Sequence, residues 1–195
     1  MEADWTVALA ADDPVITVPW AAPEGERGCK FVDLRLGGHL IEEIEEARAR
    51  PALRSALRVL NDAASPLWTA KCDAWTSSAD EGAELFDAYE MDATPGETGF
   101  GAGCYIDLLS REAALLSSFE RQERWLRVVS EALRVIPARA AKVELVLRRA
   151  EVEGVAGFGV TWFVEGCGVS AQNAGHRWSE ALTLALPAIM EVRSA

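Results

Sequence analysis

Alternating apolar and polar residues predict β-strands along much of the chain. In 29–36, Val32 and Leu34 alternate with Asp33 and Arg35, which is the period of a strand with one buried face. Shorter apolar segments at 5–9 and 15–18 flank the turn-like Asp12-Asp13-Pro14 and predict an N-terminal hairpin. A second hairpin is predicted around Glu153-Gly154. The remaining predicted strands are 67–76, 100–109, 142–149 and 158–165.

Apolar residues three or four positions apart predict helices at about 40–60, 118–136 and 171–186. Pro51 lies inside the first of these, so we expect a kink or two consecutive helices, the second starting near Pro51. Ser117 followed by Glu120 has the spacing of a capping box before the second helix. Ser170 is the expected N-cap of the last helix.

The order of these elements predicts a single α+β domain over residues 1–195. Its sheet is expected to be mainly antiparallel with helices on one face. Residues 29–150 match a ferredoxin-like βαββαβ core. Residues 1–28 add an N-terminal hairpin and loop, and residues 151–195 add an extra C-terminal strand and helix.

The period of two also predicts which side chains share the sheet face without helices. The expected set combines both signs of charge with an aromatic hydroxyl, a mixture that can bind a polar ligand or support acid–base chemistry. Trp75 is placed there too, where it could line a ligand cleft or an interface. Cross-strand ion pairs on a wet sheet face are the alternative interpretation. The candidate ligand or partner residues are Lys71, Asp73, Trp75, Tyr105 and Asp107, and the same face is expected to carry Asp33, Arg35, Glu144 and Arg148.

Negative charge is concentrated in one part of the chain. The formal net charge is -12, and residues 72–110 contain nine acidic residues with no Lys or Arg. This charge disfavours nucleic acid and an anionic membrane surface as partners, and it favours a protein partner with a basic surface. Asp87, Glu90 and Asp92 are metal-ligand candidates, although they do not follow the calcium-loop spacing of an EF-hand and also suit a solvated loop.

The remaining motifs point to no cofactor. The four cysteines have no C-x-x-C spacing and no nearby His, which argues against zinc and favours reduced, buried thiols. Two histidines are too few for a His-dominated metal site, and the glycine-rich segments do not follow the dinucleotide pattern. The N-terminal residues lack a secretory signal and no apolar stretch approaches the roughly 20 residues of a membrane span, so we expect a soluble, cytoplasmic protein.

These observations leave two functional interpretations open. The first is a non-catalytic binding or protein-interaction domain with an acidic surface. The alternative is a small-molecule or divalent-metal-dependent enzyme that uses carboxylates on the open sheet face. The sequence is also compatible with a homo-oligomer and does not name a substrate or a partner.

Overall fold

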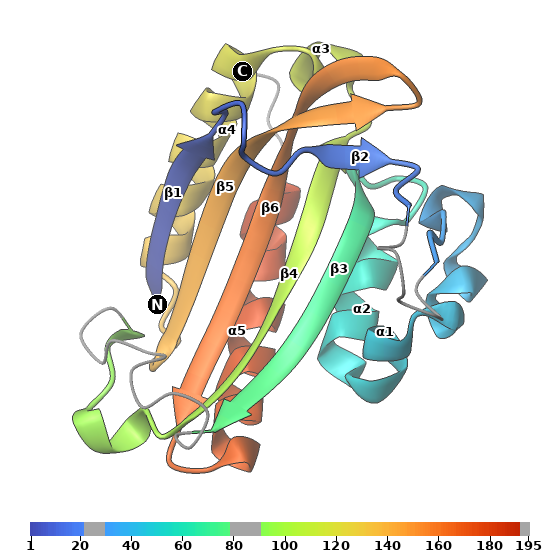
Figure 1. The fold of residues 1–195 in the computed structure, drawn as a ribbon. Coiled ribbons are helices and arrows are strands. Elements are labelled where there is room, and N and C mark those ends of the chain that lie inside the picture. The colour runs from blue at the N-terminus through green and yellow to red at the C-terminus, as the bar shows by residue number, and fades with distance from the viewer. Residues whose placement is uncertain (22–29, 79–90, 192–195) are drawn as a thin grey trace.

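The chain folds around one mixed sheet in an α+β arrangement (Figure 1). The structure, a computed structural model, describes residues 1–21, 30–78 and 91–191. The six-stranded sheet has the order β1–β5–β6–β4–β3, and β2 also pairs with β5. The strands are β1 (Glu2–Ala8), β2 (Ile16–Val18), β3 (Leu67–Ser78), β4 (Phe100–Ser110), β5 (Ala141–Val152) and β6 (Val155–Gly168).

Both N-terminal strands run parallel to β5, whereas the other neighbouring strands are antiparallel. β1 pairs with residues 142–148 and β2 with residues 150–152 of the same strand. The end of the β5–β6 hairpin curves across the sheet, and β2 follows it (Figure 1). Ile16 and Val18 of β2 pack there against Trp68, Ala70 and Leu109 in a small apolar cluster. This packing places β2 over the ends of β3 and β4.

The helices cover one face of the sheet and leave the other face uncovered, as Figure 1 shows. The main core lies between this sheet face and α2, α4 and α5. Among the described residues, no helix has both the length and the apolarity required to span a bilayer. The helices are α1 (Glu45–Ala49), α2 (Pro51–Leu60), α3 (Ala113–Leu116), α4 (Phe119–Arg134) and α5 (Ala171–Met190), with 3-10 turns η1 (Leu34–Leu36), η2 (Gly38–Glu43) and η5 (Pro95–Glu97).

Local signals explain where these helices begin. Pro51 is the first residue of α2, a position where the helix needs no backbone N–H from that residue. The prediction that 40–60 divides into two helices, the second starting near Pro51, is confirmed. Ser170 caps α5 by accepting a hydrogen bond from the Asn173 N–H, as expected. The cap of α4 is one residue later than predicted, because Ser118 and not Ser117 accepts from the Arg121 N–H.

Gly166 allows α5 to lie directly against β6. A Cβ atom at this position would overlap the backbone of Trp178. The backbones of the central strand and the longest helix therefore approach more closely than any side chain at position 166 would permit.

Three predicted features of the fold are wrong. Residues 30–33 are irregular and 34–36 form η1, so the expected strand at 29–36 is absent from the described residues and the ferredoxin-like order loses its first strand. The Asp33 carboxylate accepts the Arg35 N–H and starts this turn, a local bond that competes with a strand. The N-terminal segments form no hairpin, because each pairs with β5. β6 is a central strand and not an addition to the core.

Candidate functional site

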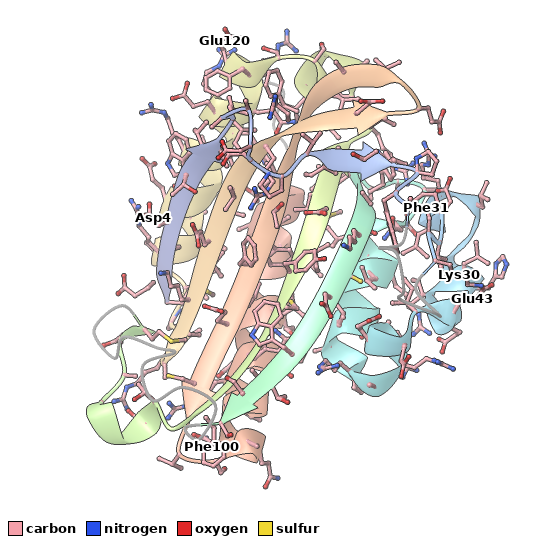
Figure 2. The ribbon with its side chains drawn as sticks, viewed as in Figure 1. Asp4, Lys30, Phe31, Glu43, Phe100 and Glu120 are labelled. Carbon is pink, nitrogen blue, oxygen red and sulfur yellow. The ribbon has the colours of Figure 1, made fainter. Side chains whose placement is uncertain are left out.

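The strand register aligns side chains in rows across the uncovered sheet face. Core residues such as Cys104, Ile106 and Trp162 point toward the helices, so the residues that alternate with them point to the opposite side. Figure 2 is viewed onto that side and shows side chains that stand on the strands without a helix above them. One row is Lys71, Asp107, Thr161 and Val146; the next is Asp73, Tyr105, Phe163 and Glu144; a third is Trp75, Gly103, Glu165 and Lys142.

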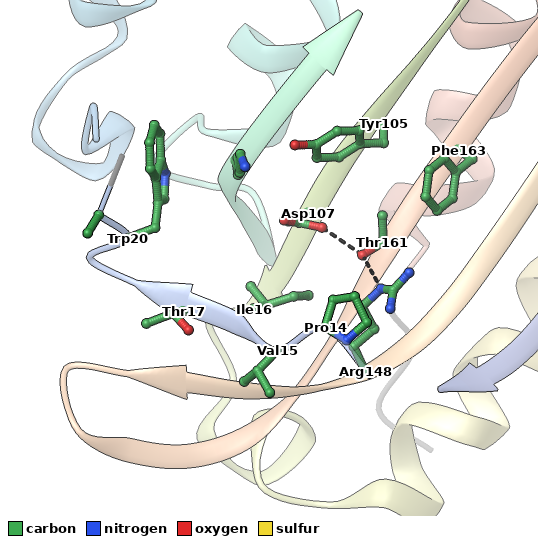
Figure 3. A pocket seen from close by; sticks show the side chains of 12 residues that line it. Pro14, Val15, Ile16, Thr17, Trp20, Tyr105, Asp107, Arg148, Thr161 and Phe163 are labelled. Atoms are coloured by element: carbon green, nitrogen blue, oxygen red, sulfur yellow. Dashed lines mark hydrogen bonds between the residues drawn. The ribbon is translucent and has the colours of Figure 1, made fainter. Parts of the chain in front are cut away.

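A pocket of about 480 Å³ opens on this face beside β2 (Figure 3). The sheet forms its floor, and the segment from Pro14 to Ala21 forms its wall. Parallel pairing with the end of β5 holds this wall in place. The floor residues are Lys71, Tyr105, Asp107, Arg148, Thr161 and Phe163, and the wall residues are Pro14, Val15, Ile16, Thr17, Trp20 and Ala21.

A chain of hydrogen bonds crosses the floor of the pocket. Arg148 Nε donates to Thr161 Oγ1 at 2.9 Å. The same hydroxyl donates to Asp107 Oδ1 at 2.6 Å. Figure 3 shows both bonds as dashed lines. Since Thr161 is buried and uses its hydroxyl as both donor and acceptor, it fixes the guanidinium and the carboxylate relative to each other.

Burial raises the pKa of Asp107 above its ordinary value. The Thr161 hydroxyl, Arg148 and Lys71 oppose this effect, because a hydrogen bond and nearby cations favour the ionised carboxylate. The net direction is nevertheless upward. Asp107 therefore takes a proton at higher pH than an exposed aspartate.

Aromatic rings surround the second cation of the pocket. Lys71 Nζ lies 5.3 Å from the centroid of the Trp20 ring and 6.0 Å from that of Tyr105. Trp20 is anchored by a 3.1 Å hydrogen bond from its Nε1 to the Ala70 carbonyl. The Tyr105 and Phe163 rings pack with centroids 5.9 Å apart. Burial raises the pKa of Tyr105, so its hydroxyl keeps its proton and can donate a hydrogen bond.

Several polar groups in the pocket have hydrogen-bonding capacity that no described residue uses. Within residues 1–21, 30–78 and 91–191, neither terminal nitrogen of Arg148 donates to a protein acceptor, and Lys71 Nζ has no ion pair or hydrogen bond. Asp107 Oδ2 and the Tyr105 hydroxyl also make no hydrogen bond to a described residue. Many arginines elsewhere bind a carboxylate, among them Arg35, Arg58, Arg121, Arg127 and Arg177. The pocket thus presents mainly unused donors.

The structure brings together three of the five predicted ligand residues. Lys71, Tyr105 and Asp107 line the pocket. Asp73 and Trp75 lie on the same sheet face in the neighbouring rows and are not among the lining residues. Trp75 lies over Gly103, where a Cβ atom would be 2.7 Å from the indole ring, so this glycine provides the space that the ring occupies.

The other nine lining residues are not among the predicted site residues, and four of them have side chains that matter to the proposed chemistry. Arg148 was placed on the correct face, and Thr161 and Phe163 could have been placed there by extending the period of two along 158–165. Trp20 carries no such signal. It follows β2, and only the parallel pairing of β2 with β5 brings it to the pocket. Two other predicted face residues, Asp33 and Arg35, lie at η1 and not on a strand.

The predicted metal ligands are not tested. Asp87 and Glu90 fall outside the described residues, and Asp92 is exposed with φ 49°. Among the residues that are described, no group of three or more His, Cys, Asp or Glu side chains is arranged to hold a metal ion. The partner with a basic surface and the carboxylate-dependent enzyme also stay predictions.

The described cysteines offer no ready nucleophile. Cys72, Cys104 and Cys167 are free thiols, and Cys29 lies outside the described residues. Burial raises the pKa of all three described thiols, that of Cys104 to about 12. They are therefore protonated at neutral pH, and a protonated thiol is a poor nucleophile.

Comparisons with protein-family models, curated proteins and solved structures found no match to this chain. The chemistry of the pocket is therefore the basis for its functional interpretation.

Proposed function

We propose that this protein binds a small organic anion in the pocket between β2 and the uncovered sheet face. The observation that carries this proposal is the set of unused donors on Arg148, Lys71 and Tyr105. Polar groups that line a concave site without protein partners are the groups that orient a ligand. Their positive charge lies in a chain of net charge -12, so it is a local property of the pocket.

The two cations have different roles in this proposal. Arg148 is held through Nε by Thr161, which leaves both terminal nitrogens to donate in parallel to a carboxylate or a similar planar anion. Lys71 supplies a second positive charge from β3, which β6 and β4 separate from the strand of Arg148. Its ammonium group is attracted to the faces of Trp20 and Tyr105, an interaction that limits where this flexible side chain lies.

The rest of the pocket favours an apolar or aromatic ligand body. Ile16, Trp20, Tyr105 and Phe163 present hydrocarbon and ring surface to the cavity. The volume of about 480 Å³ falls in the range of small-molecule sites, roughly 300–1,000 Å³. Ring contacts add about 0.5–1.5 kcal/mol beyond burial of area. An aromatic monocarboxylate therefore suits both the charges and the surface.

Calorimetric titration with benzoate, phenylacetate and indole-3-acetate tests the proposal. We expect at least one of these probes to bind the wild-type protein and Arg148→Gln to weaken that binding at least tenfold, because the paired donors are lost. Arg124→Gln is the matched control, since Arg124 is exposed on α4, a helix of the covered face. Absence of binding by all three probes, or equal affinity of the Arg148→Gln and wild-type proteins, would overturn the proposal.

A further inference from the structure

Asp107 lies next to the place where the proposed anion would bind. Its Oδ1 accepts from the Thr161 hydroxyl, which in turn accepts from Arg148 Nε, so carboxylate and guanidinium are two hydrogen bonds apart. Its other oxygen, Oδ2, has no hydrogen-bond partner among the described residues. An anion held by the terminal nitrogens of Arg148 therefore shares the pocket with a second negative group.

Burial, and not the surrounding charge, is what disfavours two ionised carboxylates in this pocket. Lys71 on β3 and Arg148 on β5 are the cations that act on it, and Tyr105 on β4 is a neutral phenol. Thr161 on β6 does not titrate, and the lining residues contributed by β2 and its flanking segments include no titratable group. Burial already raises the pKa of Asp107 against the effect of both cations. A ligand carboxylate adds like charge and removes further water, and both changes raise that pKa again.

Two buried carboxyl groups within hydrogen-bond distance of each other are most stable when they hold one proton between them. We propose that the pocket takes a monocarboxylic acid together with one proton from solvent, which is shared between Asp107 Oδ2 and the ligand carboxyl group. This inference rests on the proposed function and specifies the ligand group that the site recognises. The ligand carboxyl group also accepts from Arg148, and both Arg148 and Lys71 face the single negative charge that remains. No covalent bond forms or breaks.

Proton uptake gives the affinity a defined dependence on pH. Benzoate is ionised in solution throughout pH 5–8, so the proton goes to the site. Above the pKa of Asp107 in the free protein, the affinity must fall up to tenfold for each pH unit, until the pH passes the higher pKa of the bound pair. Below the pKa of Asp107 in the free protein, the carboxyl group is already protonated and the affinity no longer depends on it.

Asp107→Asn separates this mechanism from a loss of structure, because the amide resembles a protonated aspartate. Its Oδ1 can still accept from Thr161, and its Nδ2 can donate to the ligand without a proton from solvent. We expect this variant to bind benzoate without pH dependence and at least tenfold more tightly than wild type at pH 8. The difference should shrink as the pH falls toward the pKa of Asp107 in the free protein. Titrations in buffers of different ionisation enthalpy should show close to one proton taken up by wild type at pH 8 and none by the variant.

The outcomes distinguish this inference from the proposed function. If benzoate binds to wild type but without proton uptake, or if Asp107→Asn binds more weakly at every pH, the shared proton is refuted and anion binding stands. The second result would mean that the site needs Asp107 as an ionised carboxylate. If neither benzoate, phenylacetate nor indole-3-acetate binds to wild type at pH 5 or pH 8, both proposals fail.

Discussion

The hydroxyl of Thr161 determines how Asp107 and Arg148 are arranged in the pocket. It is buried and makes one hydrogen bond to each of these side chains. A hydroxyl can do this because it is both donor and acceptor, whereas an apolar side chain of the same shape would leave both partners unsatisfied. The strength of the site therefore depends on a residue that need not touch the ligand.

Thr161→Val tests this role at nearly constant volume. We expect the free energy of unfolding to fall by about 1–3 kcal/mol, since partly buried charged groups lose a hydrogen bond. The affinity for benzoate should also fall, because Arg148 is no longer held through Nε. The matched control is Thr183→Val, whose hydroxyl bonds to the Ser179 carbonyl on the exposed side of α5. Urea unfolding and calorimetry measure both effects, and a loss of affinity equal in the two variants would contradict the role.

Among the elements, β6 and α5 depend on a close backbone approach at Gly166. The nearest atoms to a Cβ built at this position belong to the backbone of Trp178, which cannot rotate away as a side chain would. Gly175, in α5 itself, has no atom within 4 Å of such a Cβ. Substitution by alanine is therefore expected to change the stability of the protein in opposite directions at these two positions.

Gly166→Ala should destabilise the protein by about 1–3 kcal/mol or more through overpacking. Gly175→Ala should stabilise it by up to about 1 kcal/mol, because alanine favours a helix more than glycine does. Thermal and urea unfolding of both variants measure the difference. A Gly166→Ala protein as stable as wild type would contradict this prediction, because β6 and α5 would then tolerate a larger separation without loss of stability.

The elements that could be predicted are those specified by short-range signals. Alternation in 100–109 and 142–149, the start of α2 at Pro51 and the Ser170 cap of α5 depend on residues close in sequence, and the structure confirms these predictions. The same period of two placed Lys71, Tyr105 and Asp107 on one face. The pairing of strands could not be predicted from such signals, because the parallel pairing of β2 with β5 joins residues more than a hundred positions apart. Alternation says which face a residue occupies and not which strand lies beside it, so the wall with Trp20 could not be foreseen.

At the scale of the whole molecule, Glu97 connects three distant parts of the chain. Its carboxylate pairs with Arg177 of α5 at 2.5 Å and with Arg139, which precedes β5, at 3.1 Å. It also accepts hydrogen bonds from the backbone N–H and hydroxyl of Thr94 at the start of η5. The hydrogen bond from Arg177 is the largest cause that lowers the pKa of Glu97 to about 2.

This lowered pKa predicts how Glu97 contributes to stability as a function of pH. The ordinary value in the unfolded chain is 4.5, so the folded protein binds the proton less tightly. The contribution is therefore complete above pH 4.5 and is lost as the pH falls from 4.5 toward 2. Glu97→Gln should be less stable than wild type at pH 7, and the two unfolding curves should converge as acid is added.

Glu131→Gln provides the control for the change in net charge. Glu131 is exposed on α4 and has no ion pair among the described residues. Both substitutions relieve the same amount of repulsion in a chain of net charge -12, so any difference between them reports the local contacts of Glu97. A constant gap between wild type and Glu97→Gln from pH 7 to pH 2 would show that the side chain acts through packing. If the stability of wild type converges in acid with that of Glu97→Gln and not with that of Glu131→Gln, the charge of Glu97 joins the segment around η5 to the end of the sheet.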